Sequence, residues 1–120
     1  MTITSTSLTL FLDYARKGEG YYYGGGAAML AERVAKAAHK YKTAKRRAEA
    51  VYDALCTFAK ECDHNPKTEC FMLPCEGGYR VSYEAGPYEW AIVASDALGQ
   101  IGIFAEPYYS FDLCFYPSED

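Results

Sequence analysis

Residues 30–62 read LAERVAKAAHKYKTAKRRAEAVYDALCTFAKEC, a stretch in which apolar or small residues recur at alternating spacings of four and three. No glycine or proline occurs between Gly26 and Pro66. The pattern therefore predicts a helix over residues 27–62 with one heptad seam, which must be buried. The seam consists of Leu30, Val34, Ala37, Tyr41, Ala44, Ala48, Val51, Leu55, Phe58 and Cys62.

The length of this helix leaves two arrangements open. Its thirty-six residues would span about 54 Å, whereas a compact domain of 120 residues has a radius of gyration near ~14 Å. Either the helix breaks into a hairpin near residues 39–47 and lies on the protein's own sheet, or it stays continuous and pairs with a second copy. The unbroken heptad phase favours continuity, since a break normally resets the phase. We therefore expect a homodimer.

The segments on either side of this helix complete an α+β fold. Leu8, Phe11, Leu12 and Ala15 predict a short N-terminal helix that begins after Ser7, followed by a glycine-rich loop. Short connectors between the C-terminal patterns indicate antiparallel hairpins. We expect one domain over residues 1–120, helical over 7–62, with an antiparallel meander of four or five strands over 70–116. Period-two patterns mark strands over residues 70–73, 79–83, 88–94, 101–104 and 109–115.

Composition limits the class of protein. Half of the 120 residues are hydrophobic, enough for a core, but the apolar runs are far shorter than the ~20 residues that cross a bilayer. Residues 1–5 lack the basic region of a secretory signal, so a cytoplasmic protein is expected. Five cysteines, an odd number, fit reduced thiols better than a disulfide framework.

One cluster has the residue types of a metal site. Cys62, His64, Cys70 and Cys75 lie within fourteen residues, and thiolate with imidazole suits tetrahedral zinc. The spacing lacks the paired C-x2-C ligands of common zinc folds, so we expect no metal, and no cofactor motif occurs elsewhere. No arrangement assigns a nucleophile, acid and base, so we expect the protein not to be an enzyme.

Charge is divided between the two halves of the chain. Residues 1–60 carry ten Lys and Arg against five Asp and Glu, whereas residues 61–120 carry two against eleven. Between Arg33 and Arg47 the sequence has seven basic residues and no acidic one. Such a helix can lie along a phosphate backbone, which makes nucleic-acid binding one candidate function. The basic residues that would carry it are Arg33, Lys36, Lys40, Lys45, Arg46 and Arg47.

The acidic half is also rich in tyrosine, and the whole chain contains twelve. Tyrosine anchors protein interfaces, and carboxylates steer a basic partner toward them. We therefore expect first a non-enzymatic protein-binding module that acts by occlusion or as an adaptor. A narrower form is a small inhibitor of a nucleic-acid-handling complex, such as an anti-CRISPR-type anti-defence protein. The expected partner-binding residues are Tyr83, Glu84, Tyr88, Glu89, Glu106, Tyr108, Tyr109 and Asp112.

Overall fold

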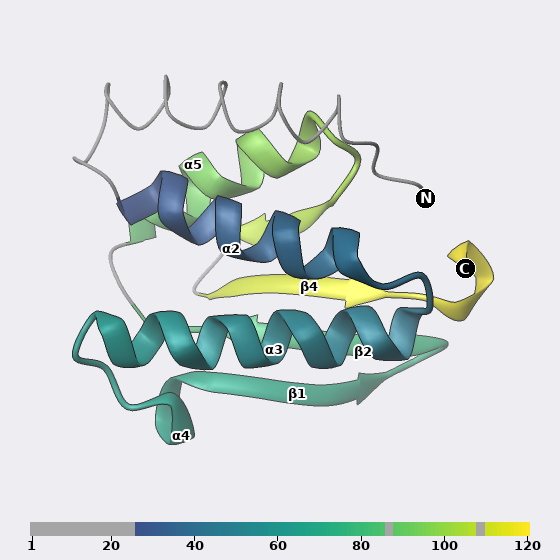
Figure 1. Cartoon of the computed structure of the whole chain (residues 1–120), viewed down its shortest axis with the longest axis horizontal. Helices are drawn as coiled ribbons and strands as arrows, with labels where there is room; N and C mark the ends of the chain where they lie inside the picture. Colours follow the sequence, from purple (N-terminus) through teal and green to yellow (C-terminus); the bar gives the residue numbers. More distant parts are fainter. Residues whose placement is uncertain (1–25, 86–87, 108–109) are drawn as a thin grey trace.

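The structure, a computed structural model, describes residues 26–85, 88–107 and 110–120 (Figure 1). The expected N-terminal helix and most of the glycine-rich loop lie outside the described residues. The elements run in the order α2 (Gly26–Lys40), α3 (Ala44–Glu61), α4 (Pro66–Glu69), β1 (Cys70–Cys75), β2 (Gly78–Tyr83), α5 (Tyr88–Gly99), β3 (Ala105–Pro107), β4 (Phe111–Phe115) and the 3-10 turn η1 (Pro117–Glu119).

The long helix is broken, which corrects the expectation of continuity. α2 and α3 form an antiparallel hairpin joined by residues 41–43, and they lie side by side in Figure 1. Seam residues of both arms face the protein's own core, where Leu30, Val34, Val51 and Leu55 are at most 1% exposed. The continuous seam was the argument for a homodimer, so that expectation stays a prediction without this support.

Caps at the turn explain the break, although no glycine or proline marks it. The Thr43 side chain accepts a hydrogen bond from the Arg46 N–H at 3.4 Å and begins α3. The Arg47 Nε donates to the Tyr41 carbonyl at 2.9 Å, which holds the turn closed. A continuous helix would also place Lys42 one turn from Lys45 and Arg46, where like charges destabilise a helix.

The predicted fold class is confirmed: helices pack on a four-stranded antiparallel sheet in the order β1-β2-β4-β3. The β1–β2 hairpin turns at Glu76-Gly77, where Gly77 has a φ of 78°, a value that glycine adopts without strain. The sheet is not a simple meander, because α5 carries the chain from β2 to the far edge and β4 returns between β2 and β3.

Residues 88–94, expected as a strand, belong to helix α5 instead. Ala91, Ala94 and Leu98 are buried at helical spacing, and Ile92 between them is 44% exposed. α5 packs on α2 and on β3. The strand expected at residues 101–104 lies later, at Ala105–Pro107.

Three aromatic side chains, from α3, β2 and α5, pack together at the centre of the core. The Phe58 ring on α3 lies 6.0 Å from that of Tyr83 on β2 and 6.1 Å from that of Trp90 on α5, measured between ring centroids. These separations lie in the range of favourable aromatic pairs. No helix among the described residues is both long and apolar enough to cross a membrane.

Candidate functional site

The two faces of the sheet have different surroundings. α3 packs on β1, β2 and β4, and side chains that face it, among them Val81, Leu113 and Phe111, are buried. Alternation along the strands sends their neighbours to the opposite face, on which no described helix packs. We call this the open face. Its strand residues are Phe71, Leu73, Cys75, Gly78, Arg80, Ser82, Glu106, Asp112 and Cys114.

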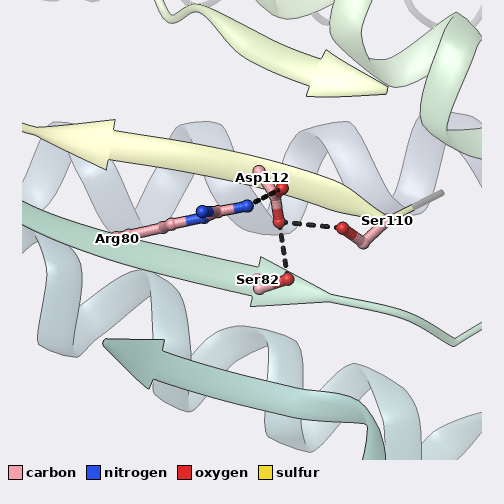
Figure 2. Close-up of polar contacts among 4 residues, drawn as sticks. All are labelled: Arg80, Ser82, Ser110 and Asp112. Atoms are coloured by element: carbon pink, nitrogen blue, oxygen red, sulfur yellow. Dashed lines mark hydrogen bonds and ion pairs between the residues drawn. The ribbon is translucent and has the colours of Figure 1, made fainter. Parts of the chain in front are cut away.

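A polar network lies at the centre of the open face (Figure 2). Ser82 on β2 lies directly opposite Asp112 on β4 and donates a hydrogen bond to its Oδ1 at 2.5 Å. Ser110 donates to the same oxygen at 3.0 Å, and Arg80 forms an ion pair with Oδ2. Both carboxylate oxygens of Asp112 are therefore engaged, and the guanidinium of Arg80 is held in the plane of the sheet surface (Figure 2).

The electrostatics of this network favour a fixed charge pair over proton transfer. Burial by itself would raise the pKa of the Asp112 carboxyl, but hydrogen bonds from Ser82, Arg80 and Ser110 and the Arg80 charge outweigh it. The pKa therefore lies below its ordinary value. A carboxylate with a lowered pKa is a poor base for either serine hydroxyl. The arrangement is thus better suited to holding Arg80 in place than to activating a nucleophile.

A groove of about 390 Å³ runs beside this network. β3 pairs only with Phe111–Leu113 of β4, so the last residues of β4 have no strand beside them on that side among the described residues. The groove lies there, between the segment Gly102–Phe104 and the end of β4. Its charged lining consists of Arg47, Arg80, Glu106, Asp112 and Glu119, a net charge of −1.

Exposed apolar side chains border the open face and the groove. Leu73 on β1 is 49% exposed, and Phe104 at the groove is 79% exposed. Large apolar side chains left in solvent beside a hollow are typical of a binding surface. The open face thus combines apolar anchors, an immobilised Arg80 and an unpaired strand end.

The structure places some of the expected partner-binding residues at the surface and others in the interior. Tyr83 is only 2% exposed and faces the helices, so it is not a surface anchor, which corrects that expectation. Glu84 and Glu106 are exposed, and Asp112 is buried in the network with Arg80. Nothing is described for the side chains of Tyr88 and Glu89, and Tyr108 and Tyr109 lie outside the described residues.

The basic residues do not form one stripe, because the helix that would carry them is broken. Arg33 pairs with Glu61 at 2.7 Å, and Lys36 pairs with Glu32 at 2.7 Å. Arg47 is only 8% exposed. The remaining members, Lys40, Lys45 and Arg46, are exposed around the turn between α2 and α3.

The candidate metal ligands do not come together. Cys75 lies at the opposite end of β1 from Cys70, and six strand residues span about 17 Å between the first and last Cα. His64 instead lies 3.3 Å from Glu69, measured from Nδ1 to Oε2. Among the described residues, no three potential ligands are grouped closely enough to hold a metal ion.

The sequence did not predict the polar network of Arg80, Ser82, Ser110 and Asp112. Arg80 is the only basic residue after Lys67, and the alternation of residues 79–83 already indicated that Arg80 and Ser82 share a face. Their partner Asp112 is thirty residues or more away, so only the pairing of β2 with β4 shows the network. Comparisons with protein-family models, with curated proteins and with solved structures give no match.

Proposed function

We propose that this protein is a non-enzymatic protein-binding module that holds an extended segment of another protein along the open face of its sheet. The observation that carries the proposal is the groove beside the uncovered end of β4. An extended peptide can add to such a strand end, where its main chain supplies affinity and its side chains supply specificity.

The surroundings of the groove define the chemistry of the partner. Phe104 and Leu73 offer apolar contacts, since both are largely exposed. The groove lining is net negative, and residues 61–120 carry eleven acidic residues against two basic ones. A basic segment with apolar side chains is therefore the best complement. The acidic lining attracts such a segment, which speeds its approach, and repels acidic competitors.

The narrower form of the proposal is inhibition by occlusion. An acidic surface that occupies the phosphate-binding groove of a nucleic-acid-handling protein would exclude its substrate, as expected of an anti-CRISPR-type inhibitor. The supporting feature is the acidic character of residues 61–120. In this form, nucleic acid and the present protein should compete for the same partner.

Site-specific photo-crosslinking tests the binding face. A photoreactive phenylalanine at position 104 should capture a partner from a nuclease-treated lysate of the cells in which the protein occurs, whereas the same group at the exposed Thr57 of α3 should not. The captured partner should then bind Glu106→Lys more slowly than wild type, and bind the matched control Asp53→Lys normally. Equal capture from positions 104 and 57, or loss of capture after nuclease treatment, would contradict the proposal.

A further inference from the structure

A second charged surface lies at the turn between α2 and α3, on different elements from the open face. Four cations project there: Lys40 at the end of α2, Lys42 in the turn, and Lys45 and Arg46 in the first turn of α3. All four are exposed. We call these residues, together with Tyr41, the basic tip.

The cations of the basic tip form no ion pair within the described part of the chain. Ion pairs join Arg33 to Glu61 and Lys36 to Glu32, but no described carboxylate pairs with Lys40, Lys42, Lys45 or Arg46. The sequence has no acidic residue between Glu32 and Glu49. Four like charges therefore stand together, at a cost in mutual repulsion that an anionic ligand would relieve.

The turn also orders part of this charge. The Lys40 Nζ lies over the Tyr41 ring, 5.6 Å from its centroid, and the Arg46 guanidinium carbon lies over the same ring at 4.9 Å. Cation–π attraction thus holds two cations from different helices beside one aromatic ring. Because these cations lie over the ring, Tyr41 is better placed to position charge than to stack on a base.

Helix dipoles add little to the field at the tip. The negative end of α2 and the positive end of α3 meet there and largely cancel. The α3 terminus is further neutralised by Asp120, which accepts a hydrogen bond from the Ala44 N–H at 2.6 Å. The attraction for an anion must therefore come from the four side chains.

We propose that the basic tip binds the phosphodiester backbone of nucleic acid without sequence preference. A string of phosphates is the polyanion that complements several exposed cations, because each neutralised phosphate releases a counterion. Three of the four cations are lysines, which act as flexible point charges, and the planar guanidinium of Arg46 lies over the Tyr41 ring, so the tip favours phosphate contacts over base readout. Asp120 lies at the start of α3 and offsets part of the charge of the tip, whereas the acidic residues of the sheet should repel the same polymer from the open face.

The test is fluorescence anisotropy with a labelled random-sequence DNA duplex, the matching single strand and an RNA duplex. With four phosphates neutralised, log Kobs for the DNA duplex should fall with log[NaCl] at a slope of about −3.6, or about 150-fold between roughly 50 and 200 mM. The single strand should give a slope of about −2.8. The three probes show which polymer supplies the phosphates.

Two double variants distinguish binding at the basic tip from attraction to the overall charge of the protein. Lys42→Ala combined with Lys45→Ala should halve the slope to about −1.8, since two phosphate contacts are lost. The matched control, Lys60→Ala with Lys67→Ala, removes the same charge from exposed positions at the end of α3 and on α4, and should keep the wild-type slope. Melting curves of both double variants should match wild type, because all four lysines are exposed.

A second pair of variants tests the positioning role of Tyr41. Tyr41→Phe retains the ring and should bind like wild type, whereas Tyr41→Leu should lower affinity a few-fold at an unchanged salt slope. Three outcomes would overturn the proposal: no nucleic acid bound at low salt, equal losses in the tip and control double variants, or binding of anionic lipid vesicles in place of nucleic acid. None of these variants alters the groove, so the outcome is independent of the proposed protein-binding function.

Discussion

The carboxylate of Asp120 accepts a hydrogen bond from the backbone N–H of Ala44, across seventy-six positions of sequence. This contact places an acidic side chain at the positive end of α3, where it satisfies one of the N–H groups that have no partner within the helix. Thr43 satisfies a second, that of Arg46. The start of α3, and with it the helix hairpin, thus depends on both neighbouring and distant residues.

Removal of this cap should destabilise the fold. Asp120→Ala leaves the Ala44 N–H without its acceptor and should lower the free energy of unfolding by about 1 kcal/mol. Asp120→Asn keeps an acceptor and should cost less. Urea denaturation measures both, with the exposed Ser118→Ala of η1 as the control. If Asp120→Ala unfolds at the same urea concentration as Ser118→Ala, the cap contributes nothing.

The Asp112 network should make stability depend on pH at the acid end. Its lowered carboxyl pKa means that the native state favours the ionised form, so the stabilisation is present above the ordinary aspartate pKa of about 4 and is lost as the pH falls. Asp112→Asn should therefore lower stability at neutral pH and flatten the profile between about pH 5 and 2. The exposed Glu84→Gln serves as control. An unchanged acid profile in Asp112→Asn would refute the prediction.

Tyr83 should tolerate, or gain from, loss of its hydroxyl. The side chain is 2% exposed, and the hydroxyl has no hydrogen-bond partner among the described residues. Because an unsatisfied buried hydroxyl costs about 1–3 kcal/mol, Tyr83→Phe should raise the free energy of unfolding by roughly 1 kcal/mol. Tyr79→Phe, at a half-buried position on the same strand, is the comparison. Marked destabilisation of Tyr83→Phe would show that the hydroxyl is satisfied in solution.

The same tyrosine should affect stability in alkali. Burial, foremost, and the nearby thiol of Cys62 raise the pKa of the Tyr83 hydroxyl. A raised pKa in the folded state means that stability is retained below the ordinary tyrosine pKa of about 10 and is lost above it. Tyr83→Phe should therefore lose less stability than wild type between about pH 10 and 12. Parallel alkaline profiles for the two proteins would contradict this.

Gly26 should resist substitution because of Trp90. A Cβ atom at Gly26 would lie 2.0 Å from the Cζ2 atom of the indole ring, so Gly26→Ala must displace Trp90 and should cost about 1–3 kcal/mol. Trp90 is the only tryptophan, so its fluorescence reports the displacement directly. Gly99→Ala is the matched control, since no described atom outside its own stretch of helix lies within 4 Å of its Cβ position. A native emission spectrum in Gly26→Ala would contradict the prediction.

The cysteines should differ in reactivity. Burial, foremost, and the neighbouring Cys56 raise the pKa of the Cys70 thiol to about 12, and its side chain is 3% exposed. Cys70 should therefore stay unmodified by a thiol reagent at about pH 8 until the protein unfolds. Burial also raises the pKa of the Cys114 thiol, but its side chain is exposed, so Cys114 should react slowly in the native state. Peptide mapping identifies the modified sites. Early modification of Cys70 would show that the region of α3 and β1 opens readily.

Local pattern determined much of the fold. The period-two pattern of residue types in the sequence indicated β1, β2 and β4, because the side chains of a strand point to alternate faces whatever it pairs with. The spacing from Leu30 to Phe58 indicated helix and identified the buried side of both α2 and α3. The prediction from a period of two failed at residues 88–94, since the buried residues Ala91, Ala94 and Leu98 follow helical spacing and the alternating Ile92 is exposed.

Four features were decided by tertiary structure. The break at residues 41–43 depends on packing of α2 against α3 and on the cap from Asp120, whereas the heptad phase continues through it. The Arg80–Asp112 pair requires β4 to lie beside β2, and the open end of β4 requires β3 to be short. Burial of Tyr83 follows from the face that α3 covers. Sequence periodicity indicates the direction of each side chain relative to its own backbone. Which strands pair, and which face of the sheet a helix covers, depend on contacts between residues that are distant in the chain.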